Sequence, residues 1–160
     1  MEDRPLRVLF VCLGNICRSP TAEGVFRYLI DNEAPRLRVE IDSAGTADFH
    51  AGEAPDPRTQ RAALRRGIDL SGLQARQVRA DDFNQFDYVL AMDRDNLRDL
   101  RELQPAASRA DVRLFLEFAP ALDRLEMPDP YFGDDSGFED VVDLSIAASR
   151  GLIAWLEQRT

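Results

Sequence analysis

Cys12 and Arg18 have the residue types and the spacing that phosphate chemistry requires. They stand six positions apart, and Gly14 and Asn15 between them both tolerate the left-handed backbone of a tight loop. A guanidinium group can bind two phosphate oxygens at once, and a cysteine thiolate is a nucleophile. This spacing therefore predicts a loop that binds an oxyanion and attacks it.

The elements on either side of this loop favour the same interpretation. Residues 6–11 form a β-branched, apolar run typical of a buried strand, and Ser19-Pro20 is typical of a helix N-cap followed by proline. A loop between a strand and a helix directs several main-chain N–H groups at one point, where they also stabilise a thiolate. The expected phosphate-binding loop consists of Leu13, Gly14, Asn15, Ile16, Cys17 and Arg18.

The two cysteines have alternative interpretations. Cys12 alone is equally consistent with a small buried residue at a strand end, and the loop around it is what favours the nucleophile. Cys17 is either a small residue packed in the loop or a partner for a disulfide with Cys12 under oxidation. The sequence leaves both interpretations of Cys17 open.

The rest of the chain alternates between strand-like and helix-like patterns. Further strands are expected at 37–43, 86–92 and 112–116, and helices at 19–32, 56–67, 94–103 and 138–158. Such alternation predicts an α/β fold, a three-layer sandwich whose four-stranded parallel sheet carries helices on both faces. Ligands of such sheets bind beyond the carboxyl ends of the strands, where the loop after Cys12 begins.

Composition excludes several classes of function. A net charge of -9 over 160 residues disfavours a nucleic-acid partner, and no apolar run approaches the length of a membrane span. Two cysteines and one histidine do not form a disulfide scaffold or a usual zinc site, so we expect no metal and no cofactor. Without a recognisable secretion signal, the expected location is the cytoplasm.

Several segments of the chain resemble one enzyme family. Cys12-Leu13-Gly14-Asn15-Ile16-Cys17-Arg18-Ser19-Pro20 is similar to the signature of the low-molecular-weight protein tyrosine phosphatases. Further similar segments follow in the family's order, namely Ser43-Ala44-Gly45-Thr46, Pro55-Asp56-Pro57-Arg58, Ala75-Arg76-Gln77, Ala91-Met92-Asp93 and Asp129-Pro130-Tyr131. The resemblance implies one domain over residues 1–160, the strand order 2-1-3-4, and hydrolysis of phosphotyrosine through a phosphorylated Cys12.

The resemblance also assigns roles to residues outside the loop. Asp129 matches the family's general acid, which protonates the leaving tyrosyl oxygen and then deprotonates the attacking water. Aromatic side chains are expected to line the substrate pocket at Phe49, Tyr131 and Phe132, and polar support for the loop is expected from Asn15, Ser19 and Ser43. Asp93 either orients Arg18 or simply begins a helix, and for Asp56 a turn or N-cap role is favoured.

One position departs from the family pattern. Leu73 stands where many relatives carry a histidine that holds the loop asparagine, which predicts a weaker polar network around Asn15 and a softer loop. Ile16 favours phosphotyrosine, because the related arginine phosphatases carry threonine there.

Alternative functions remain on the same fold. An arsenate reductase needs further cysteines after Cys17, and none follows. A phosphate-binding regulatory module without turnover is the alternative from outside the enzymes. Phosphotyrosine proteins are the expected partners, and a tyrosine kinase is a further candidate. The chain is expected to be a monomer or weak dimer and not to insert into membranes.

Overall fold

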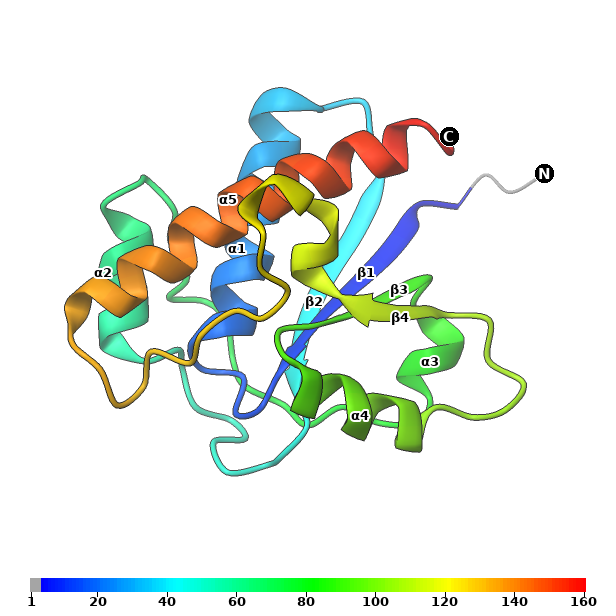
Figure 1. Cartoon of the computed structure of the whole chain (residues 1–160), viewed down its shortest axis with the longest axis horizontal. Coiled ribbons are helices and arrows are strands. Elements are labelled where there is room, and N and C mark those ends of the chain that lie inside the picture. The colour runs from blue at the N-terminus through cyan, green and yellow to red at the C-terminus, as the bar shows by residue number, and fades with distance from the viewer. Residues whose placement is uncertain (1–3) are drawn as a thin grey trace.

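A parallel sheet lies between two layers of helices in the computed structural model, which describes residues 4–160 (Figure 1). The four strands within these residues are β1 (Leu6–Cys12), β2 (Val39–Gly45), β3 (Tyr88–Ala91) and β4 (Asp111–Leu114). Their order is β2-β1-β3-β4 with all neighbours parallel, so the predicted fold class and strand order are confirmed. The domain expected over 1–160 includes residues 1–3, which lie outside the described residues.

The helices divide between the two faces of the sheet. One face carries α1 (Arg18–Glu33), α2 (Pro57–Leu64) and α5 (Asp135–Glu157), and the other carries α3 (Asp82–Gln85) and α4 (Arg94–Leu103) (Figure 1). Two short 3-10 helices, η1 (Phe115–Phe118) and η2 (Pro120–Leu122), connect β4 to the loop before α5. The predicted three layers, a parallel sheet with helices on both faces, are therefore confirmed.

Strand β1 forms the centre of both hydrophobic cores. Val8 and Phe10 face the layer of α1 and α5, whereas Leu9 and Val11 face the layer of α3 and α4. All four residues are fully buried, which explains why the strand is an unbroken apolar run and not an alternating one. The Phe10 ring packs edge-on against the rings of two aromatic residues on its own face, Phe26 and Phe115, with centroids 5.6 and 5.0 Å away.

Parallel pairing fixes where the predicted chemistry lies. Cys12 is paired with Gly45 across β1 and β2, and Val11 is paired with Ala91 across β1 and β3. The carboxyl ends of these strands therefore meet at one edge, and the loop that follows Cys12 leaves the sheet there. This edge is also where α1 begins, at Arg18.

Helix α1 begins one residue before the predicted N-cap. Ser19-Pro20 was expected to supply the N-cap and first helical residue, but the cap position is Cys17 and no side chain caps the helix. The Ser19 hydroxyl contacts Cys12 Sγ and Asn15 Nδ2 instead. The first turn of α1 therefore keeps its N–H groups available to a ligand.

Other boundaries differ because side chains redirect the backbone. The predicted strand 112–116 ends at Leu114. The Leu114 N–H donates to the Glu117 carboxylate at 2.9 Å, and η1 begins at the next residue. Asp134 accepts from the Ser136 N–H, so α5 begins three residues earlier than predicted. Helix α2 ends at Leu64 and not at the expected C-cap Gly67, which has a positive φ of 80° just beyond it.

Two smaller differences concern short elements. Strand β2 lies two residues later than predicted, because residues 34–37 still turn and the ladder runs on to Gly45. Helix α3 was not predicted, since a four-residue helix shows no apolar period.

Candidate active site

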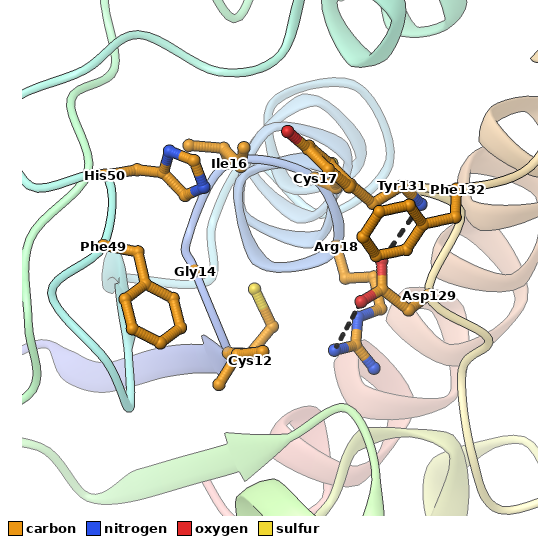
Figure 2. Close-up of a pocket in the computed structure, with 11 residues that line it drawn as sticks. Cys12, Gly14, Ile16, Cys17, Arg18, Phe49, His50, Asp129, Tyr131 and Phe132 are labelled. Atoms are coloured by element: carbon orange, nitrogen blue, oxygen red, sulfur yellow. Dashed lines mark hydrogen bonds and ion pairs between the residues drawn. The ribbon is translucent and has the colours of Figure 1, made fainter.

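The loop after β1 forms the floor of a pocket at the carboxyl edge of the sheet (Figure 2). The pocket has a volume of about 220 Å³. Its walls come from the loop itself, from the segment after β2 and from the segment before α5. The lining residues are Cys12, Leu13, Gly14, Ile16, Cys17, Arg18, Phe49, His50, Asp129, Tyr131 and Phe132.

The backbone of the loop is arranged to offer N–H groups to an anion. Its carbonyls are occupied from outside, because the oxygens of Cys12, Leu13 and Ile16 accept from the N–H groups of residues 46, 47 and 56 at 2.9–3.0 Å. In the part of the chain that the structure describes, the N–H groups of residues 13, 14, 16 and 17 have no hydrogen-bond partner. Unpaired N–H groups at a helix start are a ready anion site.

The sulfur of Cys12 lies at the bottom of this pocket. Cys12 is only 3% exposed, yet it lines the cavity, so a substrate can reach the sulfur from one side only. The Asn15 N–H donates to Sγ at 3.3 Å, and the Ser19 hydroxyl lies 3.1 Å from it. Both groups can donate a hydrogen bond to a thiolate at this position.

Arg18 is held in place by a carboxylate and a carbonyl. One amino group of its guanidinium donates to Asp93 Oδ2 at 2.7 Å and to the Met127 carbonyl at 3.1 Å. Burial lowers the pKa of Arg18, but the negative charges of Cys12, Asp93 and Asp129 together raise it by more. The pKa of Arg18 therefore lies above its usual value. The guanidinium is therefore a fixed cation beside the sulfur.

Asp93 has both of the contacts that the sequence left as alternatives. Its Oδ1 accepts from the Asn96 N–H at 2.8 Å and caps α4, while its Oδ2 binds Arg18. Asp56, by contrast, caps α2 and pairs with Arg58, which holds the pKa of this carboxyl below its usual range. The structure thus places Asp56 where the N-cap interpretation puts it.

Asp129 lies above the floor of the pocket with its carboxyl exposed to a ligand. Its Oδ2 is 3.8 Å from Arg18 NH2, and its Oδ1 accepts from the Tyr131 N–H at 3.1 Å (Figure 2). The side chain is 45% exposed. A group in this position can exchange protons with a substrate atom bound between it and Cys12.

Aromatic side chains form the rim of the pocket. Tyr131 and Phe132 pack edge to face with centroids 4.9 Å apart, and Phe49 lies on the opposite side of the opening (Figure 2). Phe49 is 69% exposed and Phe132 is 94% exposed, which is unusual for side chains of this size. An aromatic substrate would cover both rings.

The polar network around Asn15 is complete without a histidine. Asn15 Nδ2 donates to the Ser19 and Ser43 hydroxyls at 2.7 and 3.0 Å, and Oδ1 accepts from the Arg76 N–H at 3.0 Å. The prediction that Leu73 weakens this network is therefore wrong for its hydrogen bonds, and Leu73 packs against the hydrophobic core. The softer loop stays a prediction.

Glu23 extends the network and was not identified from sequence. Its carboxyl is buried, accepts from Ser43 Oγ at 2.7 Å and pairs with Arg27 at 2.9 Å. Burial raises the pKa of Glu23 against these two contacts. A lone acid on a helix gives no sequence signal for such a role, because solvent-exposed acids occur at the same spacing.

Two further site residues were also missed. His50 lines the pocket and its ring lies close to Gly14, where an added Cβ would be 3.1 Å from Cδ2. A Cβ on Gly45 would lie 2.7 Å from the Leu13 carbonyl oxygen, so the two loops can meet only because position 45 is glycine. The family-like segment Ser43-Ala44-Gly45-Thr46 was the available signal for Gly45.

Comparisons with known proteins match this architecture. The model of the family "Low molecular weight phosphotyrosine protein phosphatase" matches residues 7–160. The protein with that name from Schizosaccharomyces pombe is 47% identical over 137 residues, which are 84% of this chain and 86% of the relative. A protein tyrosine phosphatase structure from Entamoeba histolytica superposes with a TM-score of 0.91 at 38% identity, covering 96% of this chain and 97% of that chain.

The chain belongs to the low-molecular-weight protein tyrosine phosphatase family. It is therefore a phosphatase, and the family predicted from its motifs is confirmed. No helix within residues 4–160 has the length and apolar character needed to cross a bilayer.

The fold of this phosphatase alone does not select its substrate. A Drosophila arginine phosphatase superposes with a TM-score of 0.88 at 27% identity and covers 95% of this chain and 98% of that chain. Ile16 lines the pocket of this phosphatase with an apolar side chain. The same fold therefore occurs in proteins that are named for different phosphatase activities.

Cys17 has the properties of a packed residue in this phosphatase. Both cysteines are free thiols, and Cys17 is 5% exposed. Burial raises the pKa of Cys17 to about 12, although the nearby Thr59 side chain lowers it. The disulfide between Cys17 and Cys12 that the sequence suggests under oxidation stays a prediction.

Proposed function

We propose that this chain hydrolyses protein phosphotyrosine through a phosphorylated Cys12. The observation that carries the proposal is the shared pocket of three groups: the Cys12 sulfur on the floor, the Arg18 guanidinium beside it and the Asp129 carboxyl above. A phosphate between them meets a nucleophile, a fixed cation with unpaired N–H groups, and a proton donor. Phosphoryl transfer needs mainly this positioning and charge stabilisation.

The first step transfers the phosphoryl group to sulfur. The Cys12 thiolate attacks phosphorus, the S–P bond forms and the bond from phosphorus to the tyrosyl oxygen breaks. Asp129 in its acid form gives its proton to that oxygen, so tyrosine leaves as a neutral phenol. Arg18 and the loop N–H groups stabilise the equatorial oxygens as charge shifts.

The second step returns the enzyme to its starting state. Asp129, now a carboxylate, removes a proton from a water that attacks the phosphocysteine. The S–P bond breaks, inorganic phosphate forms, and the Cys12 thiolate is released next to the Ser19 hydroxyl and the Asn15 N–H. These donors stabilise the departing thiolate by hydrogen bonding, without transfer of a proton to the sulfur.

The depth of the pocket favours tyrosine over serine. The sulfur lies below a rim of exposed aromatic rings, with Phe49 and Phe132 on its two sides. A long, flat phenyl ring can hold phosphate on the floor while its peptide stays outside the rim. Stacking on these rings adds about 0.5–1.5 kcal/mol beyond area burial.

Side-by-side turnover of phosphotyrosine, phosphoserine and phosphoarginine peptides in the presence of EDTA tests this function. We expect turnover of the phosphotyrosine peptide alone, and no turnover by Cys12→Ser. Preference for phosphoarginine would contradict the assigned substrate. A chain that binds phosphate but turns over no substrate would be a regulatory module.

Replacement of Asp129 tests the general acid separately. For Asp129→Ala we expect kcat/KM on phosphotyrosine to fall by about 10²–10⁴, the usual contribution of general acid catalysis. The loss should be much smaller on an aryl phosphate whose leaving group departs without a proton. An equal loss on both substrates would remove Asp129 from the acid role.

A further inference from the structure

The guanidinium of Arg76 joins two carboxylates behind the phosphate-binding loop. It donates to Asp42 Oδ2 at 3.1 and 3.2 Å and to the two oxygens of Asp82 at 3.0 and 3.1 Å. The Asp82 side chain is 2% exposed, so this pair is shielded from solvent on one side. Two-pronged pairs of this kind fix an arginine more firmly than a single contact does.

The main chain of Arg76 is attached to the site on both sides. Its N–H donates to Asn15 Oδ1 at 3.0 Å, and its carbonyl accepts from the Gly45 N–H at 2.8 Å. Val78 N–H then donates to the Gly45 carbonyl at 2.8 Å. Residues 76–78 therefore run beside Gly45, and the guanidinium anchors this short segment to the body of the protein.

The contact with Asn15 determines how its amide is turned. Because Oδ1 faces the Arg76 N–H, Nδ2 must face the Ser19 and Ser43 hydroxyls. Ser19 Oγ in turn lies 3.1 Å from Cys12 Sγ. The Asn15 amide therefore donates to the same hydroxyl that contacts the sulfur, and this hydroxyl also lies 3.4 Å from the Ala44 carbonyl oxygen.

The backbone of Asn15 depends on the same anchor. Its φ of 58° is in the left-handed region, which asparagine adopts more readily than most residues and which the hydrogen bonds of its side chain help to hold. In this conformation the Asn15 N–H donates to Cys12 Sγ at 3.3 Å. Loss of the Oδ1 contact would release both the conformation and the donor.

We propose that Arg76 is a positioning residue for Cys12. Its ion pairs with Asp42 and Asp82 hold the main-chain N–H that orients Asn15, and Asn15 then holds two hydrogen-bond donors against the sulfur. The consequence for turnover rests on the proposed function, whereas the consequence for the reactivity of the thiol does not. Arg76 itself touches neither sulfur nor substrate.

Alkylation of Cys12 by iodoacetate at fixed pH measures this positioning directly. In Arg76→Gln the main-chain N–H remains but its anchor is lost, and we expect alkylation and kcat to fall roughly tenfold, as small displacements of reacting groups do. Arg76→Lys keeps one ion pair and should give intermediate rates. Arg150→Gln removes the remote exposed pair with Glu33 and should leave both rates unchanged.

The outcomes separate positioning from general support of the fold. Slower alkylation in folded Arg76→Gln, with partial recovery in Arg76→Lys, supports the proposal. An alkylation rate equal to that of the wild type overturns it, even if the melting temperature falls. If Arg76→Gln does not fold, Asp42→Asn, which retains the pair with Asp82, is measured with the same two outcomes.

A double-mutant cycle identifies the route of the effect. If Arg76 acts through Asp82, the alkylation rates of Arg76→Gln, Asp82→Asn and the double variant should be non-additive. Additive losses would show that the two residues act separately and would contradict the proposed route. A wild-type chain that does not hydrolyse phosphotyrosine would refute the proposed function and leave the alkylation comparison valid.

Discussion

The two cysteines differ in what surrounds their sulfur atoms. Cys12 Sγ meets hydrogen-bond donors and a pocket, whereas Cys17 is packed against the first turns of α1 and α2. Sequence spacing already favoured Cys12 as the nucleophile, but it left open whether Cys17 is a packed residue or an oxidation partner. Burial, which sequence does not show, makes the difference.

A consequence is selective alkylation. Because burial raises the pKa of Cys17 to about 12, its thiol stays neutral and unreactive between pH 7 and pH 9. We expect one equivalent of iodoacetate to react in this range, on Cys12 alone, by peptide mass mapping. Comparable labelling of Cys17 in the folded protein would contradict the burial argument.

The same pKa predicts a loss of stability in alkaline solution. Below pH 9.0, the ordinary value for this thiol, Cys17 is neutral in both the folded and the unfolded chain. Above that pH only the unfolded chain releases the proton, so the free energy of unfolding falls as pH rises towards 12. In Cys17→Ala this part of the pH dependence should disappear from denaturant titrations.

Gly45 offers a test of how closely the loops meet. In Gly45→Ala the new Cβ would lie 2.7 Å from the Leu13 carbonyl oxygen and 3.1 Å from that of Ala47, and neither backbone atom can move freely. We expect a loss of about 1–3 kcal/mol in the free energy of unfolding, together with lower turnover. Gly72→Ala, where a Cβ meets nothing within 4 Å, is the matched control. Equal stability of the two variants would show that the loops adjust.

At the scale of elements, helix α4 and the phosphate-binding loop share Asp93. Asp93→Asn keeps an oxygen for the Asn96 N–H but presents an amide to Arg18 in place of a carboxylate. We expect inorganic phosphate to inhibit about tenfold more weakly, since hydrogen bonds to charged groups contribute 1.5–3 kcal/mol. The thermal stability of α4 should change little.

The control for this variant is another helix cap. Asp134 caps α5 and is exposed, so Asp134→Asn should leave phosphate inhibition unchanged at about 0.5 M salt, where exposed charges are screened. If Asp93→Asn also showed unchanged inhibition, Asp93 would be a helix cap only.

The bounds of an element could be predicted where a regular apolar pattern defines it. They were uncertain where a hydrogen bond from a single side chain ends the element. Strand β1 and helix α4 follow from their patterns alone, and α4 has the predicted bounds. The end of β4 depends on one hydrogen bond from Leu114 to Glu117, which no periodicity reveals. The position of α1 likewise depends on Ser19 bonding inside the loop and not at its own helix start.

At the scale of the whole molecule, the net charge is -9, and part of the negative charge lies in the segments that line the pocket. The two segments that form the pocket walls, 46–54 and 128–136, contain neither arginine nor lysine. Their carboxylates are those of Asp48, Glu53, Asp129, Asp134 and Asp135. We expect the charges in these wall segments to act on the substrate residues that flank a bound phosphotyrosine.

We therefore expect a preference among peptides of equal length. At low salt, kcat/KM should be higher for a phosphotyrosine flanked by arginine than for one flanked by glutamate. The ratio should shrink as salt is raised, because screening lengths fall to about 8 Å near 0.15 M ionic strength. A preference for acidic flanks, or a ratio independent of salt, would show that these carboxylates do not act on the substrate.

The fold class could be predicted from the alternation of strands and helices, and the strand order from the resemblance of the motifs to the phosphatase family. What sequence could not provide is the support behind the loop, where Arg76, Glu23 and Gly45 act through distances between segments far apart in the chain. Such contacts exist only once the sheet has brought β1 and β2 together.

The central claim is that phosphate passes through the sulfur of Cys12. Rapid quenching of the enzyme with an aryl phosphate, followed by mass mapping, tests it most directly. The account predicts one phosphoryl group on Cys12 during turnover, accumulating in Asp129→Ala because the water then lacks its base, and none in Cys12→Ser. Turnover that continues in Cys12→Ser, or proceeds with no phosphate on Cys12 at any time, would contradict it.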